Sequence, residues 1–166
     1  MNKKNGIIIA CVTISVIVVA FVVFYVFLNR PASTMVYVES QTISGTVGQN
    51  FTININIMNV ADLYGWQLKL SWNATILDVA NVTEGTFLKS QRATFFNSII
   101  NETGYLVLDC ALLGDVSGVD GSGVMATIQF HVRENGSCDL LLYDTVLVNS
   151  SEQIIAHTVR DGRFST

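Results

Sequence analysis

The sequence predicts an all-β sandwich that follows one N-terminal transmembrane helix. Three observations support this fold class. Apolar and polar residues alternate with a period of two along several segments after residue 34. Glycine-containing turns separate these segments at intervals of about 8–12 residues. No segment after residue 34 has a convincing helical period. We therefore expect about nine short strands in a single sandwich or jelly-roll domain.

The N-terminal part of the chain contains an apolar segment, 6–28, without any charged residue. A helix of about 20 apolar residues is long enough to cross a bilayer. Lys3 and Lys4 precede the segment, whereas only Arg30 follows closely. The positive-inside rule then places residues 1–5 in the cytoplasm and the rest of the chain outside the cell.

The transmembrane hypothesis divides the chain into a signal-anchor helix at 6–28, a short linker at 29–34 that contains the only proline, and an extracellular domain at 35–166. Two alternatives remain open. A cleaved signal peptide would have an apolar region of only about 7–15 residues. A pilin-type leader would be cut after Gly6, which would leave the helix to pack in a filament.

The domain is organised around the segment 63–79, which reads LYGWQLKLSWNATILDV. Side chains alternate across a strand, so two opposite faces are expected here. The buried face is predicted to hold Tyr64, Trp66, Leu68, Leu70 and Trp72, and the solvated face Gly65, Gln67, Lys69 and Ser71. Burial of each large apolar side chain contributes about 1.5–3 kcal/mol before entropy is counted. This strand is therefore the expected anchor of the core.

The other strands are predicted from the same alternation, in chain order. The segment 35–40 forms the first strand, and a turn at 44–50 leads to 51–57, where apolar residues alternate with Thr and Asn. After the central segment, further strands are expected at 76–82, 93–100, 105–113, 124–133, 138–144, 145–149 and 157–164. A glycine-rich loop is expected at 114–123, and in 124–133 Met125 is expected to point outward.

The domain outside the membrane is acidic, with six Lys and Arg against thirteen Asp and Glu, a net charge of −7. Such a domain repels phosphate groups, so nucleic acid and anionic lipid surfaces are poor candidate partners. Lipid contact is expected only through the N-terminal helix.

Six N-x-S/T sequons lie in the same domain, about three times the number expected by chance, and they predict a glycoprotein. The candidate asparagines are Asn50, Asn73, Asn81, Asn101, Asn135 and Asn149.

The cysteines indicate no reactive site. Cys11 falls in the apolar helix, where it is expected to be a small apolar residue. Cys110 and Cys138 lie in an oxidising environment and could form a disulfide. The sequence alone leaves open whether their Cα atoms come within bridging distance.

Groups for catalysis or for a metal do not converge in the sequence. His131 and His157 have no Cys, Asp or Glu at ligand spacing, and there is no nucleophile motif such as G-x-S-x-G. Asp115 and Asp120 do not match the spacing of a calcium loop, and no glutamate follows at its twelfth position. We therefore expect a non-enzymatic protein without a cofactor.

The order of several motifs resembles that of cohesin domains, and most closely the cohesin-like domains of archaeal surface proteins. The resemblance extends over about residues 36–164, and it rests on the motifs VYVES, GTVGQNFTININI, LYGWQLKLSWNATIL, GTFL, GSGVMATIQF and DGRF. Cohesins are nine-stranded jelly-roll modules that bind dockerin modules of partner proteins. The resemblance therefore implies a cell-surface module that docks an exported protein, and it implies no reaction.

In cohesins that bind dockerins, the contact face includes the outer side of the central strand, with polar residues such as Asn and Asp at the positions of Gly65 and Gln67, and this chain keeps neither of them. The fold therefore transfers better than the partner does. The resemblance indicates a recognition surface made of Gln67, Lys69 and Ser71, joined by Val107, Asp109 and Ala111 of a neighbouring strand. Dockerins carry paired calcium loops that this chain lacks, so a dockerin would come from another protein.

Two other functions remain open. Cohesins share their scaffold with carbohydrate-binding modules, so polysaccharide is an alternative partner. With both tryptophans predicted to be buried, only Tyr37, Tyr105 and Tyr143 could stack on a sugar. The domain could also be a glycosylated structural or pilin-like subunit of the cell envelope that self-associates through a sheet edge or the apolar helix.

Overall fold

The computed structural model describes residues 19–21, 24–25 and 33–166. The chain divides into two units, Met1–Ala32 and Ser33–Thr166, and the second is a β-sandwich. The predicted cytoplasmic segment, anchor helix and linker lie almost entirely outside the described residues. Among the residues that are described, no helix has both the length and the apolarity that crossing a membrane requires.

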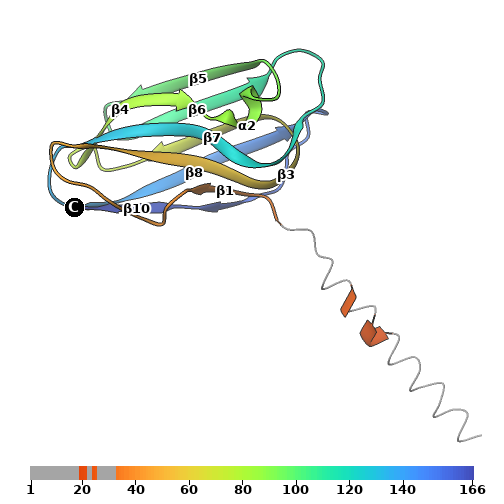
Figure 1. Ribbon diagram of the computed structural model, residues 1–166, viewed down its shortest axis with the longest axis horizontal. Coiled ribbons are helices and arrows are strands. Elements are labelled where there is room, and N and C mark those ends of the chain that lie inside the picture. The colour runs from red at the N-terminus through yellow and green to blue at the C-terminus, as the bar shows by residue number, and fades with distance from the viewer. Residues whose placement is uncertain (1–18, 22–23, 26–32) are drawn as a thin grey trace, which may run out of the picture. The chain divides into compact units, whose positions relative to one another are not determined.

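The sandwich, residues 33–166, contains ten strands and one helical turn (Figure 1). The strands are β1 (Met35–Val38), β2 (Thr42–Ser44), β3 (Asn50–Ser71), β4 (Leu77–Glu84), β5 (Thr94–Asn101), β6 (Tyr105–Leu112), β7 (Val119–Val132), β8 (Ser137–Asn149), β9 (Thr158–Arg160) and β10 (Gly162–Ser165), and the helical turn is α2 (Thr86–Lys89). The all-β architecture predicted from the alternation is confirmed.

The long strand β3 belongs to both layers of the sandwich. Its first half pairs with β1 and β7, whereas its second half pairs with β6 and β8. One layer therefore has the order β9–β1–β3–β7–β4, and the other has the order β8–β3–β6–β5. β10 pairs with β8 and with β2. Hydrogen bonding is thus continuous through all ten strands.

β3 changes layer at a bend between Asn59 and Asp62, both of which have a positive φ, 53° and 55°. Side chains of β7 hold the bend. Ser122 Oγ accepts a hydrogen bond from the Asn59 N–H at 2.9 Å, and Asp120 Oδ1 accepts one from the Asp62 N–H at 2.6 Å. Strands that change sheet at a bend or bulge form the corners of β-sandwiches.

The core lies between the two layers and is drawn entirely from residues between Val36 and Phe164. Trp66 in the second half of β3 and Trp72 directly after it face the core as predicted and are only 4% and 8% exposed, whereas Tyr64, also predicted to be buried, is half-buried. Phe130 lies near the centre, stacked with Phe51 at 5.6 Å and in edge contact with Trp72 at 5.4 Å between ring centroids. Among the residues that the structure describes, the buried core therefore belongs to the sandwich.

The structure corrects five details of the sequence analysis. The central strand and the strand before it are one element, β3, and the predicted strands 138–144 and 145–149 form the single strand β8. A helical turn, α2, follows Gly85. Half of the predicted loop 114–123 belongs to β7. Met125 is buried, because an irregularity in register between Ile55 and Asn56 turns it inward.

Candidate functional site

The most distinctive surface of the sandwich is the outward side of the layer β8–β3–β6–β5, which we call the outer face. The strand registers determine which side chains share it. The outward positions are Leu141, Tyr143, Val146 and Val148 on β8, Gly65, Gln67, Lys69 and Ser71 on β3, Tyr105, Val107, Asp109 and Ala111 on β6, and Phe95, Asn97, Ile99 and Asn101 on β5.

The six residues predicted as a recognition surface come together on this face. Gln67 pairs with Asp109, Lys69 with Val107, and Gly65 with Ala111. Ser71 is the next outward residue along β3, opposite Tyr105. The expected adjacency of these two strands is confirmed, whereas their role in recognition stays a prediction.

Lys69 is already engaged within the molecule. Its Nζ donates a hydrogen bond to Asp144 Oδ2 at 2.9 Å and lies 5.7 Å from the centroid of the Tyr143 ring. The hydrogen bond to Asp144 and the charge of that carboxylate raise the pKa of Lys69. Asp144 lies in a bulge of β8 and has a φ of 48°. The bulge therefore supplies the counter-charge that neutralises the lysine of the face.

A polar row crosses the middle of the outer face. The registers place Gln67, Asp109 and Asn97 side by side on three successive strands. Asn97 Nδ2 lies 3.5 Å from Asp109 Oδ2, at the long limit of a hydrogen bond. Because Lys69 is paired with Asp144, the carboxylate of Asp109 is the charge on the face without an ion-pair partner among the residues of the sandwich.

Apolar side chains border this row on both sides, and of these only Tyr143 was expected at the surface from the sequence. On β5, Phe95 and Ile99 are 60% and 56% exposed; on β8, Leu141, Tyr143 and Val146 are 37–45% exposed. The run of three leucines in β8 obscured the alternation, which buries Leu140 and Leu142 and exposes Leu141. Leu141 pairs with Ser71, and this pairing identifies Leu141 as an outward residue. Strand pairing is set by the tertiary structure, so the sequence alone could not reveal it.

A shallow groove of about 320 Å³ opens in the apolar part of the face. Its lining includes Gly65, Ala111 and Val148, which are paired across three strands, and the side chains of Phe95 and Val146. A Cβ atom added at Gly65 would stand 3.3 Å from Val148 Cγ2 and 3.4 Å from the Cys110 carbonyl oxygen. A side chain at position 65 would therefore crowd these neighbours, and the glycine leaves this space in the groove open.

The candidate disulfide is not formed, because Cys110 and Cys138 are both buried free thiols. Trp66 pairs with Cys110 on one side and with Leu147 on the other, so Cys110 is level with Leu147, nine residues along β8 from Cys138. At about 3.3 Å per residue this corresponds to roughly 30 Å along the strand, whereas bridged Cα atoms lie about 4.4–6.8 Å apart.

The thiol of Cys110 has a local partner instead. Its Sγ lies 3.6 Å from Glu84 Oε1, which also accepts a hydrogen bond from Thr94 Oγ1 at 2.7 Å. Burial, followed by the charge of Glu84, raises the pKa of Cys110 to about 12. Burial also raises the pKa of Cys138. Neither group is in the ionised form that attacks electrophiles at neutral pH.

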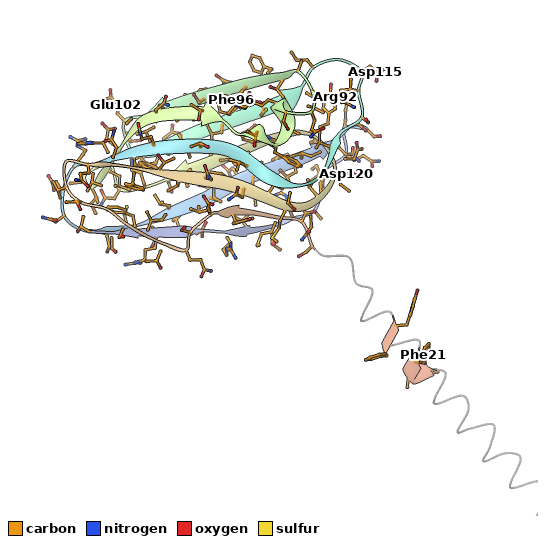
Figure 2. The ribbon with its side chains drawn as sticks, viewed as in Figure 1. Phe21, Arg92, Phe96, Glu102, Asp115 and Asp120 are labelled. Carbon is orange, nitrogen blue, oxygen red and sulfur yellow. The ribbon has the colours of Figure 1, made fainter. Side chains whose placement is uncertain are left out.

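The histidines and aspartates are used in structural contacts. His131 Nδ1 lies 2.8 Å from Asn50 Oδ1, and His157 contacts the Thr145 hydroxyl and the Ile155 carbonyl at 2.8 and 2.9 Å. Asp120 holds the bend of β3, and Asp115 lies in the loop before β7 at the same end of the sandwich (Figure 2). Across the described part of the chain, no three potential metal ligands of the His, Cys, Asp or Glu type cluster together.

Asp62 connects three distant segments. Its Oδ1 accepts a hydrogen bond from the Gly118 N–H at 2.7 Å, and its Oδ2 accepts one from Ser150 Oγ at 2.7 Å. These hydrogen bonds, that of Ser150 first, lower the pKa of Asp62. The residue is therefore a structural tie at the bend of β3.

The tyrosines that could stack on a sugar do not form one platform. Tyr105 and Tyr143 lie on the outer face, whereas Tyr37 lies in β1 of the other layer, 4.7 Å beneath the Arg160 guanidinium. Trp66 and Trp72 are buried as predicted. The surface of the sandwich thus offers isolated tyrosines rather than a row of exposed rings.

The six sequon asparagines fall into two groups. Asn50, Asn73, Asn81 and Asn135 are exposed. Asn101 and Asn149 are half-buried and have hydrogen-bonded side chains: Asn101 Nδ2 donates to the Tyr105 hydroxyl at 3.1 Å, and Asn149 Oδ1 accepts from the Gln153 N–H at 2.8 Å. Of the six, only Asn101 is an outward residue of the outer face, at its end. A glycan at any of the four exposed asparagines would leave the groove open.

Comparison with known proteins supports the family resemblance. A family model described as "Cohesin domain" matches residues 36–165. A curated relative, cellulose-binding protein A of Clostridium cellulovorans, is 28% identical over 99 residues, which cover 58% of this chain but only 5% of that protein.

Solved structures with the same fold include a non-cellulosomal cohesin of the archaeon Archaeoglobus fulgidus, with a TM-score of 0.69 and 18% identity over 81% of this chain and 91% of that one. A second is the third cohesin ScaC of Acetivibrio cellulolyticus in complex with the ScaB dockerin, with a TM-score of 0.68 and 21% identity over 80% of this chain and 98% of that one. At these identities the similarity shows the fold.

Proposed function

This chain belongs to the cohesin domain family, and we propose that its sandwich is a non-catalytic docking module that binds an exported protein partner of the dockerin type through the outer face. Structurally similar cohesins have been solved in complex with dockerins, which supports this class of partner.

The observation that carries the proposal is the gathering of exposed apolar side chains on one face. Phe95, Ile99, Leu141, Tyr143 and Val146 are all at least 37% exposed there, and two of them, Phe95 and Val146, line the groove. Exposed apolar side chains that gather on one face of a domain are typical of protein interaction sites. Apolar residues that fill a partner's pockets contribute most of the affinity of such interfaces.

The electrostatics of the face indicate what the partner should present. The Lys69–Asp144 pair is neutral as a whole, so Asp109 gives the centre of the face a single negative charge. A matching partner would place a hydrogen-bond donor or a cation over Asp109 and apolar residues over Phe95 and Val146. Complementary charge of this kind gives specificity more than affinity.

The same proposal includes the location of the module. The apolar segment 6–28 would anchor it in the plasma membrane with the sandwich outside the cell, and the exposed sequon asparagines would carry glycans. Protease accessibility of the sandwich on intact cells, with the chain retained in the membrane fraction, would test the anchor. Release of the chain into the medium would contradict it.

A binding experiment tests the docking function. The sandwich unit, Ser33–Thr166, is titrated calorimetrically with a panel of purified dockerin modules, including those encoded by the same genome. We expect at least one dockerin to bind and Val146→Asp to weaken that binding at least tenfold, because it places a second carboxylate beside the groove near Asp109.

The matched control is Val159→Asp. Val159 is a valine of nearly equal exposure, 39% against 40% for Val146, but it lies on β9 in the other layer. Docking on the outer face requires that Val159→Asp leave the affinity unchanged. Equal loss in both variants, or no binding by any dockerin of the panel, would overturn the proposal.

A further inference from the structure

The edge strand β5 lacks the features that normally prevent edge strands from pairing. Within the sandwich it pairs only with β6 among the strands that the structure describes, and Figure 1 shows it at the margin. Its eight residues, TFFNSIIN, contain no charge, proline or glycine, and its register with β6 has no bulge. Natural proteins usually protect long edges with one of these devices. An unprotected edge of this kind is a template for another strand.

The free hydrogen-bonding groups of β5 can be assigned. The Leu113 N–H donates to the Ala93 carbonyl oxygen at 2.9 Å, so these two residues form a hydrogen-bonded pair at the start of the ladder. Hydrogen-bonded and non-bonded pairs alternate along antiparallel strands. Phe95, Asn97 and Ile99 therefore bond to β6, whereas the N–H and C=O groups of Thr94, Phe96, Ser98 and Ile100 point away from it, toward the open edge.

The sequence of β5 is self-complementary in one antiparallel register. If Asn97 lies opposite Asn97 of a second copy, Phe95 of each copy lies opposite Ile99 of the other. The same register places Phe96 opposite Ser98 and Thr94 opposite Ile100, so the residues with free N–H and C=O groups meet each other. Aromatic and β-branched residues opposite each other stabilise strand pairs.

We propose that two copies of this chain associate through antiparallel pairing of their β5 strands, with Asn97 on the twofold axis. The inference does not depend on the docking function. A second copy fits because the register is symmetric and because β5 is uncharged in an otherwise acidic domain. The flanking charged residues, Arg92 and Glu102, lie beyond the opposite ends of the strand (Figure 2).

The proposed dimer has a defined geometry. Residues that face each other across an antiparallel pair lie on the same side of the sheet, so the twofold axis is perpendicular to it. The two outer faces then form one continuous surface, with the Phe95 and Ile99 side chains of both copies at its centre. The groove of each copy therefore remains exposed on this joined outer surface.

The first test measures mass against concentration by sedimentation equilibrium for Ser33–Thr166 and for the detergent-extracted full chain. We expect a monomer–dimer equilibrium that shifts toward dimer as salt screens the acidic charge. Ser98→Pro removes an N–H that points to the open edge and leaves the ladder to β6 intact, so it should weaken the dimer at least tenfold. A monomer at every soluble concentration, or a dimer that Ser98→Pro does not weaken, would overturn the proposal.

The second test reads the register and does not depend on the proline variant being folded. Both native thiols of the sandwich are buried. In Asn97→Cys the two new cysteines face each other at about the Cα distance of a disulfide, so mild oxidation should yield a covalent dimer. In the matched variant Ser98→Cys the cysteines are displaced from each other and should remain free. Crosslinking of Ser98→Cys, or of neither variant, would contradict the register. The proposal would also be overturned if β5 paired with an extended peptide of another protein and not with the β5 strand of a second copy.

Discussion

Lys69 Nζ donates a hydrogen bond to Asp144 Oδ2 at 2.9 Å, and this pair ties the C-terminal end of β3 to the bulge of β8. The two residues are 75 positions apart in the chain. The lysine that the alternation places on the outer face is therefore held by a partner that only the pairing of β3 with β8 supplies. The pair makes that part of the face neutral.

Replacing Asp144 by asparagine should lower the pKa of Lys69. Asparagine tolerates the positive φ of the bulge but carries no charge to favour the ammonium form. Because the pKa of Lys69 is raised in the folded protein, the pair stabilises the fold below the ordinary lysine pKa and loses that effect as the pH rises through the raised value. NMR titration of the lysine ε-carbons measures it, and an unchanged pKa would show that the carboxylate has no such role.

Trp72→Phe should destabilise the sandwich more than Trp66→Phe. Trp72 Nε1 donates a hydrogen bond to the Leu77 carbonyl oxygen at 3.0 Å in a buried position, whereas Trp66 contacts the Phe96 ring at 6.3 Å between centroids. Both variants lose similar ring volume, but only the first leaves a buried carbonyl oxygen without this donor. We expect Trp72→Phe to lower the free energy of unfolding by about 1 kcal/mol more than Trp66→Phe does. Urea denaturation measures it, and equal losses would argue against a net contribution from the hydrogen bond.

Cys110 should resist alkylation while the protein is folded. With a pKa of about 12, about one thiol in ten thousand is ionised at pH 8. Iodoacetamide should therefore label Cys110 only after unfolding, and the intact mass should correspond to free Cys110 and Cys138 thiols. Ser117→Cys, in the exposed loop before β7, is the control that should react at once. A peptide joined by Cys110 and Cys138 would contradict the separation of these residues in the fold.

Asp62→Asn should reduce the sensitivity of the sandwich to acid. A carboxyl group with a lowered pKa in the folded state stabilises the protein above its unfolded pKa, and this contribution is lost as the pH falls through the folded value. Wild type should therefore be more stable than Asp62→Asn at neutral pH, and this difference in the free energy of unfolding should disappear below about pH 4. Denaturation at a series of pH values measures it. The same series on Asp115→Asn, which removes the same charge from a loop, controls for the change in net charge.

The alternation of side chains was sufficient to predict which residues form the core of the central strand. Trp66, Leu68 and Leu70 are buried as expected, because a strand with one buried face imposes a period of two that is visible in the sequence. The same reasoning failed at Met125, where an irregular register turns the side chain inward. It left a connection at 58–62 between two predicted strands, where the structure instead has one strand, β3, that continues through the bend at Asn59 and Asp62.

The polar residues of the candidate site could be predicted from the sequence, whereas its apolar residues could not. Gln67, Lys69 and Asp109 were recognised as outward polar positions on neighbouring strands. Phe95 and Val146 were not, because an exposed apolar residue within an apolar segment is indistinguishable from a core residue until its pairing is known.

The sequence by itself determined the all-β class, the inward tryptophans and the family, because these depend on local alternation and on the order of motifs. Only the tertiary structure decided that β3 joins both layers, that Cys110 and Cys138 remain apart, and that Lys69 is neutralised by Asp144. The physical reason is register: which residues meet across strands depends on bulges and bends that the pairing of distant segments selects.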